Sequence, residues 1–121
     1  MIKDILLKAA EDVQQGMWCR GVWFHGHIDT ASAQDLLSGE LTADDAQKMH
    51  RCAEGSIALA TAMLGGDYST YLTTLGHAAD HINHEAGEFV SDHNDKCMKG
   101  MDAFDAGQEW ATIFRRAADA L

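Results

Sequence analysis

The residues best suited to chemistry form a run of histidines and carboxylates in the second half of the chain. At about 100° per residue on a helix, the side chains of His77, His81, His84 and Glu88 fall in one narrow row. Neutral imidazole and carboxylate groups are ligands that zinc and other transition metals prefer, and histidines four residues apart on a helix can share one ion. The sequence therefore predicts a candidate transition-metal site in this row.

Two other interpretations of the histidine row stay open. The row lies opposite the apolar face expected for its helix, where few groups would hold the imidazoles in place, so it also fits a solvated polar face. Carboxylates at Asp80 and Glu85 lie within reach of the histidines and would favour the charged imidazolium. The row therefore also fits a protein interface or a pH-sensitive surface.

The chain carries none of the common catalytic motifs. It contains no GxSxG, P-loop, GxGxxG or HExxH sequence, and His84-Glu85 lacks the second histidine of a zinc-protease helix. Each of Cys19, Cys52 and Cys97 would need a histidine within hydrogen-bond reach to become an activated nucleophile. The sequence therefore favours a non-catalytic protein and predicts no cofactor beyond the candidate transition metal.

The charge distribution indicates what kind of partner the protein would attract. The net charge is −10, which argues against direct binding to nucleic acid, because phosphate contacts need concentrated lysine and arginine. No lysine or arginine occurs between Cys52 and Asp95. This acidic half either keeps the chain soluble or steers a basic partner toward it. A related option is an acidic mimic of nucleic acid, whose partner would itself bind DNA or RNA.

Aromatic residues near the N-terminus have two interpretations. Trp18, Trp23 and Phe24 occur within seven residues, and aromatic side chains bury the largest areas in protein cores. Tryptophan is also enriched in binding hot spots, so a partner-facing patch is the alternative. The predicted partner-binding residues are Asp80, Glu85, Asp92, Trp18 and Trp23.

The elements that position these residues are predicted to be mainly helical. The chain has 121 residues, of which 46% are hydrophobic, and no proline, so we expect one helical domain, residues 1–121, an all-α bundle of about four helices. A short irregular or β segment is expected near Trp18–Ile28. The predicted helices cover residues 1–15, Thr42–Leu64 as the central core helix, about 67–91 and 105–121, with one or two helical turns at 32–39.

Three cysteines without a CxxC motif indicate a reducing compartment, and the N-terminus lacks the features of a secretory signal. The longest stretch without charge or glycine, Ser56–Leu64, is too short to cross a bilayer. We therefore expect a cytoplasmic protein without a membrane partner. The sequence leaves a homodimer open.

Three short segments carry a family resemblance: Trp18-Cys19-Arg20-Gly21, Arg51-Cys52-Ala53-Glu54-Gly55-Ser56 and His93-Asn94-Asp95. With the closing amphipathic helix they resemble a family of small uncharacterised proteins of actinobacteria and their phages, whose pattern is approximately WCxG, CxxG(A/S) and WND. The chain departs from this pattern by His93 in place of tryptophan and by a shorter segment between the first two motifs. The resemblance covers most of the chain and implies a compact helical fold and a phage or prophage origin.

Structural roles account for the residues that match these motifs. Small residues such as Cys19, Gly21, Cys52 and Gly55 allow two elements to cross closely, and Asn94-Asp95 can satisfy backbone groups in a turn. The function we expect is a non-catalytic protein-binding module, a phage-derived modulator of a host cytosolic protein.

Overall fold

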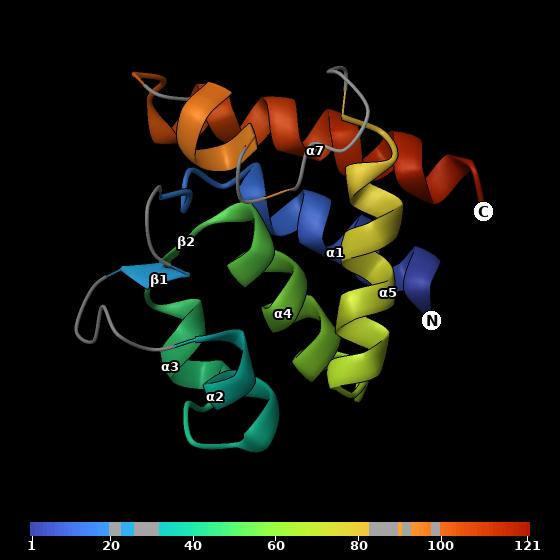
Figure 1. The fold of residues 1–121 in the computed structure, drawn as a ribbon. Helices are drawn as coiled ribbons and strands as arrows, with labels where there is room; N and C mark the ends of the chain where they lie inside the picture. Colours follow the sequence, from blue (N-terminus) through green and yellow to red (C-terminus); the bar gives the residue numbers. More distant parts are fainter. Residues whose placement is uncertain (20–22, 26–31, 83–89, 91–92, 98–99) are drawn as a thin grey trace.

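The computed structural model describes residues 1–19, 23–25, 32–82, 90, 93–97 and 100–121. It is mainly helical, as predicted (Figure 1). The elements in chain order are α1 (Ile2–Val13), β1 (Phe24–His25), α2 (Ala33–Ser38), α3 (Ala43–Gln47), β2 (His50–Arg51), α4 (Ala53–Met63), α5 (Tyr68–Ala79), the π-helical turn η1 (His93–Cys97) and α7 (Ala103–Asp119). Among these residues, no helix is both long and apolar enough to cross a membrane.

Helices α1 and α7 pack closely against each other through their apolar faces (Figure 1). A Cβ atom on Gly107 of α7 would lie only 2.0 Å from the carbonyl oxygen of Val13, so the backbones approach each other where a side chain would not fit. The core of this pair is formed on α1 by Ile5, Leu6, Ala9, Ala10 and Val13, and on α7 by Trp110, Ile113, Phe114 and Ala117.

Helix α4 occupies the centre, in contact with α1, α2, α3 and α5. Ile57, Ala58 and Leu59 are consecutive in sequence and therefore point in different directions, yet all three are buried. This helix is thus surrounded by other elements, which fits the prediction of a central core helix within Thr42–Leu64.

The prediction of one unbroken helix over Thr42–Leu64 is wrong, because Arg51 interrupts it. Helix α3 ends at Gln47, β2 follows, and α4 starts at Ala53. The Arg51 side chain is 2% exposed, and its Nη1 donates to the carbonyl oxygens of Ala46, Gln47 and Met49 at 2.8, 3.0 and 2.6 Å. These carbonyls lie at or just after the end of α3, where a helix leaves carbonyls without N–H donors, although that of Ala46 also accepts from the N–H of Met49 at 3.1 Å. The guanidinium therefore caps α3.

The backbone of Arg51 pairs on both sides. Its N–H donates to the carbonyl of Met17 at 2.6 Å, and its own carbonyl accepts from the N–H of Cys19 at 3.0 Å, which gives a parallel bridge between Trp18 and Arg51. On the other side, β1 runs antiparallel to β2 with Phe24 opposite Arg51. The short β segment predicted near Trp18–Ile28 is therefore present at Trp18 and β1.

Local capping signals explain where several helices begin and end. Ser32 and Asp35 form a reciprocal capping box at the start of α2, and Gly39 ends that helix with φ of +90°. Helix α7 starts at Ala103, two residues before the predicted Asp105. The reason is that the side chain of Asp102 accepts a hydrogen bond from the N–H of Asp105 at 2.7 Å.

Helix α5 is shorter than predicted, and the face that it buries differs from the expected one. It ends at Ala79, whereas the sequence pattern predicted a helix to about residue 91. Its buried side chains are Tyr71, Thr74 and Ala78, while Leu72 is 50% exposed. The hydroxyl of Thr74 donates to the carbonyl of Thr70 at 2.8 Å, so a polar residue fits the buried stripe without an unpaired group.

Candidate functional site

The three motif segments meet at the side chain of Asn94, which is 1% exposed. Its Oδ1 accepts hydrogen bonds from the indole N–H of Trp18 at 2.6 Å and from the backbone N–H of Ala53 at 3.1 Å. Its Nδ2 donates to the carbonyl of Cys19 at 3.2 Å and to the carboxylate of Asp95 at 3.1 Å. We call this arrangement the Asn94 junction.

Asn94 replaces one rung of the strand ladder. After the bonds from Arg51 to Met17 and from Cys19 to Arg51, the next rung of a parallel ladder would run from the N–H of Ala53 to the carbonyl of Cys19. Both groups bind the amide of Asn94 instead. A planar amide, with an acceptor oxygen beside a donor nitrogen, is suited to this position. The structure therefore explains why an asparagine occupies residue 94.

Neighbouring motif residues hold the junction against the helices. The buried His93 ring meets the Trp110 ring of α7 edge-on, with centroids 5.2 Å apart, and its Nε2 lies 3.5 Å from a carboxylate oxygen of Glu109. A Cβ atom on Gly55 would lie 2.4 Å from the carbonyl oxygen of Trp23, so glycine permits this close approach. Gly21, the remaining predicted motif residue, lies outside the described residues.

Cys52 is unsuited to be the cysteine that attacks an external substrate at neutral pH. Its Sγ accepts a hydrogen bond from the N–H of Gly55 at 3.3 Å and thereby caps α4. Burial, with smaller contributions from the nearby Cys19 and Glu54, raises the pKa of the Cys52 thiol far above its usual range. The thiol therefore stays protonated, whereas an activated cysteine needs the thiolate.

The histidine row does not continue along one helix through the described residues. Because α5 ends at Ala79, His81 lies in the turn that follows it. His77, on α5, and His81, in the turn, are partly buried, and Asp80 is exposed. His84, Glu85, Glu88 and Asp92 lie outside the described residues. Within the described part of the chain, no three histidine, cysteine or acidic side chains are grouped closely enough to hold a metal ion.

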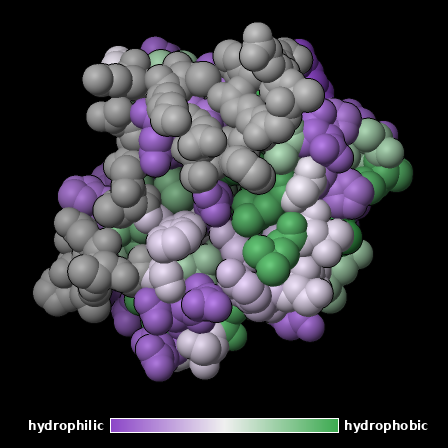
Figure 2. All heavy atoms as spheres, in the orientation of Figure 1, coloured by the Kyte–Doolittle hydropathy of each residue, from purple (hydrophilic) through white to green (hydrophobic). Residues whose placement is uncertain are grey.

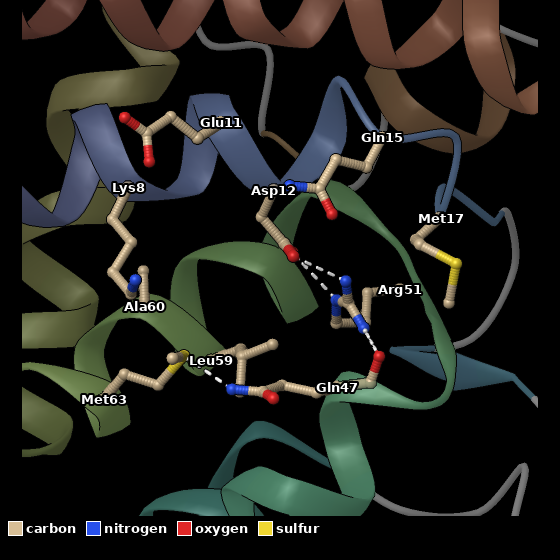
Figure 3. Close-up of a pocket in the computed structure, with 10 residues that line it drawn as sticks. All are labelled: Lys8, Glu11, Asp12, Gln15, Met17, Gln47, Arg51, Leu59, Ala60 and Met63. Carbon is tan, nitrogen blue, oxygen red and sulfur yellow. Dashed lines mark hydrogen bonds and ion pairs between the residues drawn. The ribbon is translucent and has the colours of Figure 1, made fainter.

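A cleft of about 350 Å³ lies between α1 and α4 (Figure 3). At its base, the Asp12 carboxylate accepts from Nε and Nη2 of Arg51 at 2.8 and 2.6 Å. At its side, the amide of Gln47 donates to the sulfur of Met63 at 3.3 Å. Of the described residues, no serine, threonine, cysteine or histidine lines this cleft, and its arginine already caps α3. Arg51 and Asp12 thus form an ion pair that links α3 to α1.

A second depression of about 490 Å³ lies between the end of α2 and the start of α5, and we call it the Tyr68 groove. Among the described residues, its lining contains three carboxylates and no lysine or arginine, and the ring of Tyr68 is 39% exposed. Figure 2 shows hydrophilic side chains gathered over the α2–α3 end and hydrophobic ones over α4 and α5. The groove is lined by Gln34, Asp35, Leu37, Ser38, Glu40, Asp67 and Tyr68.

The groove carboxylates are fixed in orientation by helix capping. One oxygen of Asp67 accepts from both the N–H and the hydroxyl of Thr70 at 2.9 Å, and these hydrogen bonds lower the pKa of Asp67. One oxygen of Asp35 accepts from the N–H of Ser32 at 2.8 Å. The second oxygen of each carboxylate is left for solvent or a ligand. The groove therefore presents fixed negative charge beside an exposed aromatic ring.

The predicted partner-binding tryptophans separate in the structure. Trp18 is buried and bonded to Asn94, so we remove it from the partner-binding surface, whereas Trp23 is 40% exposed. Sequence reasoning missed the Tyr68 groove, since its residues come from two helices and match no motif. A usable signal was present: between residues 21 and 95 the only lysine or arginine residues are Lys48 and Arg51.

Comparisons with protein-family models, curated proteins and solved structures give no match to this chain. Its function is therefore inferred from its own residues and geometry.

Proposed function

We propose that the protein is a non-catalytic binding module that docks through the Tyr68 groove onto a lysine- and arginine-rich segment of another protein. The observation that carries this proposal is the lining of the groove, where the residues that the structure describes combine three carboxylates and the exposed ring of Tyr68 with no cationic side chain. Complementary charge of this kind speeds encounter and selects basic partners over acidic ones.

Within residues 21–95, little positive charge offsets the carboxylates of the groove. Of the two basic residues between positions 21 and 95, Arg51 is buried and paired with Asp12, which leaves Lys48 on the surface. The lowered pKa of Asp67 keeps its carboxylate ionised throughout the neutral range. A basic segment would therefore meet little repulsion from this part of the chain.

The groove also supplies contacts that free charge alone would not. An arginine or lysine side chain can lie over the face of Tyr68, where a cation–π contact contributes about 0.5–1 kcal/mol at an exposed site. Its aliphatic stem can pack on Leu37, and the second oxygens of Asp35 and Asp67 can accept charge-assisted hydrogen bonds. These groups favour a basic segment that is amphipathic rather than uniformly charged.

The identity of the partner is proposed from the family resemblance. The phage proteins with similar motifs suggest a host cytosolic protein as the partner. A host protein that itself binds DNA or RNA through the same basic segment would make the chain an acidic mimic of nucleic acid.

Binding to a labelled peptide of alternating arginine and leucine residues, followed by fluorescence anisotropy, tests this proposal. The double variant Glu40→Gln/Asp67→Asn should weaken binding about tenfold, because two of the three groove charges are removed. Asparagine is as good an N-cap as aspartate, so α5 keeps its start. The matched control is Asp105→Asn/Asp119→Asn on α7, which removes the same charge elsewhere.

Equal losses of affinity in the groove variant and the α7 control would overturn the proposal, because binding would then depend on net charge alone. Native protein that binds the arginine–leucine peptide no better than a glutamate–leucine peptide would also overturn it. Tyr68→Ala should weaken binding without altering net charge, and unchanged affinity in this variant would remove the aromatic contact from the account.

A further inference from the structure

Cys19 and Cys52 occupy neighbouring positions on two paired backbone segments. The hydrogen bonds of Arg51 to Met17 and Cys19 define a parallel bridge between Trp18 and Arg51. The next pair in that register is Cys19 and Cys52. Parallel neighbours lie about 4.8 Å apart, which falls within the Cα separation of about 4.4–6.8 Å that disulfides span.

The Asn94 amide maintains this register beyond the cysteines. It bonds to the carbonyl of Cys19 and to the N–H of Ala53, the groups that follow the two cysteines on either segment. Paired residues of parallel strands direct their side chains to the same face, so both thiols lie on one side of the segments. In agreement, Cys19 is close enough to Cys52 to perturb its ionisation.

The two thiols differ in access to solvent. Cys19 is partly exposed, whereas Cys52 is buried beneath the start of α4, and neither is in a disulfide in this structure. We propose that Cys19 and Cys52 are a redox-active pair that forms a reversible disulfide when a hydroperoxide reacts at Cys19. Cys19 is the residue that reacts with the oxidant, and Cys52 is the residue that then displaces the oxygen from Cys19 to form the disulfide.

The chemistry balances in two steps. The Cys19 thiolate attacks one peroxide oxygen, the O–O bond breaks, and the products are a sulfenic acid at Cys19 and hydroxide, which takes a proton to become water. The Cys52 thiol, which is protonated, then attacks the Cys19 sulfur while its proton passes to the sulfenic oxygen, the S–O bond breaks, and a second water leaves. Two electrons pass from the thiols to the peroxide. A dithiol reductant reverses the reaction by thiol–disulfide exchange.

Oxidation would cross-link the Trp18 segment to the first turn of α4. Because a disulfide restricts the unfolded chain, the oxidised protein should unfold at a temperature about 10 °C higher than the reduced protein. This property is independent of peptide binding at the Tyr68 groove, which lies on other elements.

Hydrogen peroxide treatment of a Cys97→Ser variant tests the pair, since only Cys19 and Cys52 then remain. Intact mass should fall by two hydrogen atoms, peptide mapping should find Cys19 joined to Cys52 within one chain, and dithiothreitol should restore both thiols. Adding Cys52→Ser, which keeps a good N-cap, should stop the reaction at Cys19 and leave it carrying oxygen.

A Cys97→Ser variant that keeps both thiols under peroxide, while a small-molecule thiol in the same solution is oxidised, would overturn the proposal. Oxygen accumulating on Cys19 beside an unmodified Cys52, or cross-links that form only between chains, would equally overturn it. Native protein with all three cysteines should give the same intramolecular link by peptide mapping.

Discussion

The Asn94 junction and the Tyr68 groove use polar side chains in opposite ways. At the junction, one buried amide bonds to Trp18, Cys19, Ala53 and Asp95, so its donors and acceptors are used within the fold. At the groove, carboxylates bond to the backbone through one oxygen and present the other outward. Buried polar groups are costly unless paired, whereas exposed ones remain available to a partner.

The residues that form the recognisable motifs are therefore not the residues that we propose bind a partner. The segments around Trp18, Cys52 and Asn94 stand out in the sequence because close packing and buried hydrogen bonds restrict which residues fit. The groove residues Asp35 and Asp67 look like ordinary helix caps, and their shared surface appears only when α2 and α5 are brought together. A conspicuous motif can therefore mark the scaffold, with the binding surface elsewhere.

The largest expected effect is the loss of the Asn94 amide. Asn94→Ala leaves the indole N–H of Trp18, the N–H of Ala53 and the carbonyl of Cys19 buried without this partner. At about 1–3 kcal/mol for each unsatisfied group, the free energy of unfolding should fall by about 4 kcal/mol. Urea unfolding followed by circular dichroism measures it, and a loss below about 1 kcal/mol would show that water or other groups replace the amide.

Two glycines on different helices should respond in opposite ways to substitution, because one is closely packed and the other is open. Gly107→Ala should destabilise the protein by about 2 kcal/mol, because its Cβ would lie 2.0 Å from the Val13 carbonyl oxygen. Gly76→Ala on α5 should stabilise it by about 0.5–1 kcal/mol, because a Cβ there meets no atom of the described residues within 4 Å. Thermal unfolding of both variants checks the pair, and effects of the same sign would contradict the packing described here.

Alkaline pH should lower the free energy of unfolding through the buried side chain of Tyr71. Burial, reinforced by Glu54, raises the pKa of Tyr71 above its usual range. Its contribution to stability is therefore complete below the unfolded pKa of about 10 and is lost as pH rises toward the higher folded value. This loss amounts to about 1.4 kcal/mol per pH unit for one group. Tyr71→Phe should reduce the slope of unfolding free energy above pH 10 and leave it unchanged below pH 9.

The smallest effect on stability is expected at the groove. The lowered pKa of Asp67 gives a contribution that is present above the unfolded value of about 3.9 and is lost as pH falls through the lower folded value. Asp67→Asn keeps the cap and loses only this small contribution, so the unfolding midpoint at neutral pH should fall slightly, while peptide affinity falls clearly. A clear drop in the midpoint would mean that this carboxylate serves the fold rather than a partner.

Local signals predicted much of the fold. The apolar spacing of α1 and the start and end of α2 were readable from Ser32, Asp35 and Gly39, because caps and periodicity act over a few residues. The mainly helical class followed from the same patterns and the lack of proline.

Long-range contacts explain what the sequence could not predict. The apolar spacing from Ala46 to Leu64 is that of one helix. The helix is nevertheless interrupted at Arg51, whose side chain bonds to Asp12, a residue 39 positions earlier. The close approach of Gly107 to Val13 is likewise invisible in a local pattern. The Tyr68 groove was missed for the same reason, since α2 supplies part of its lining and α5 the rest.

The most direct test of the account measures stability and peptide affinity together in two variants. Trp18→Phe removes one hydrogen bond to Asn94 and some packing, and Glu40→Gln/Asp67→Asn removes two groove charges. We predict that the first loses about 1–3 kcal/mol of unfolding free energy and, while folded, keeps its affinity for the arginine–leucine peptide. The second should keep its stability and bind about tenfold more weakly. A folded Trp18→Phe protein that loses affinity, or a groove variant that retains it, would contradict the division between junction and groove.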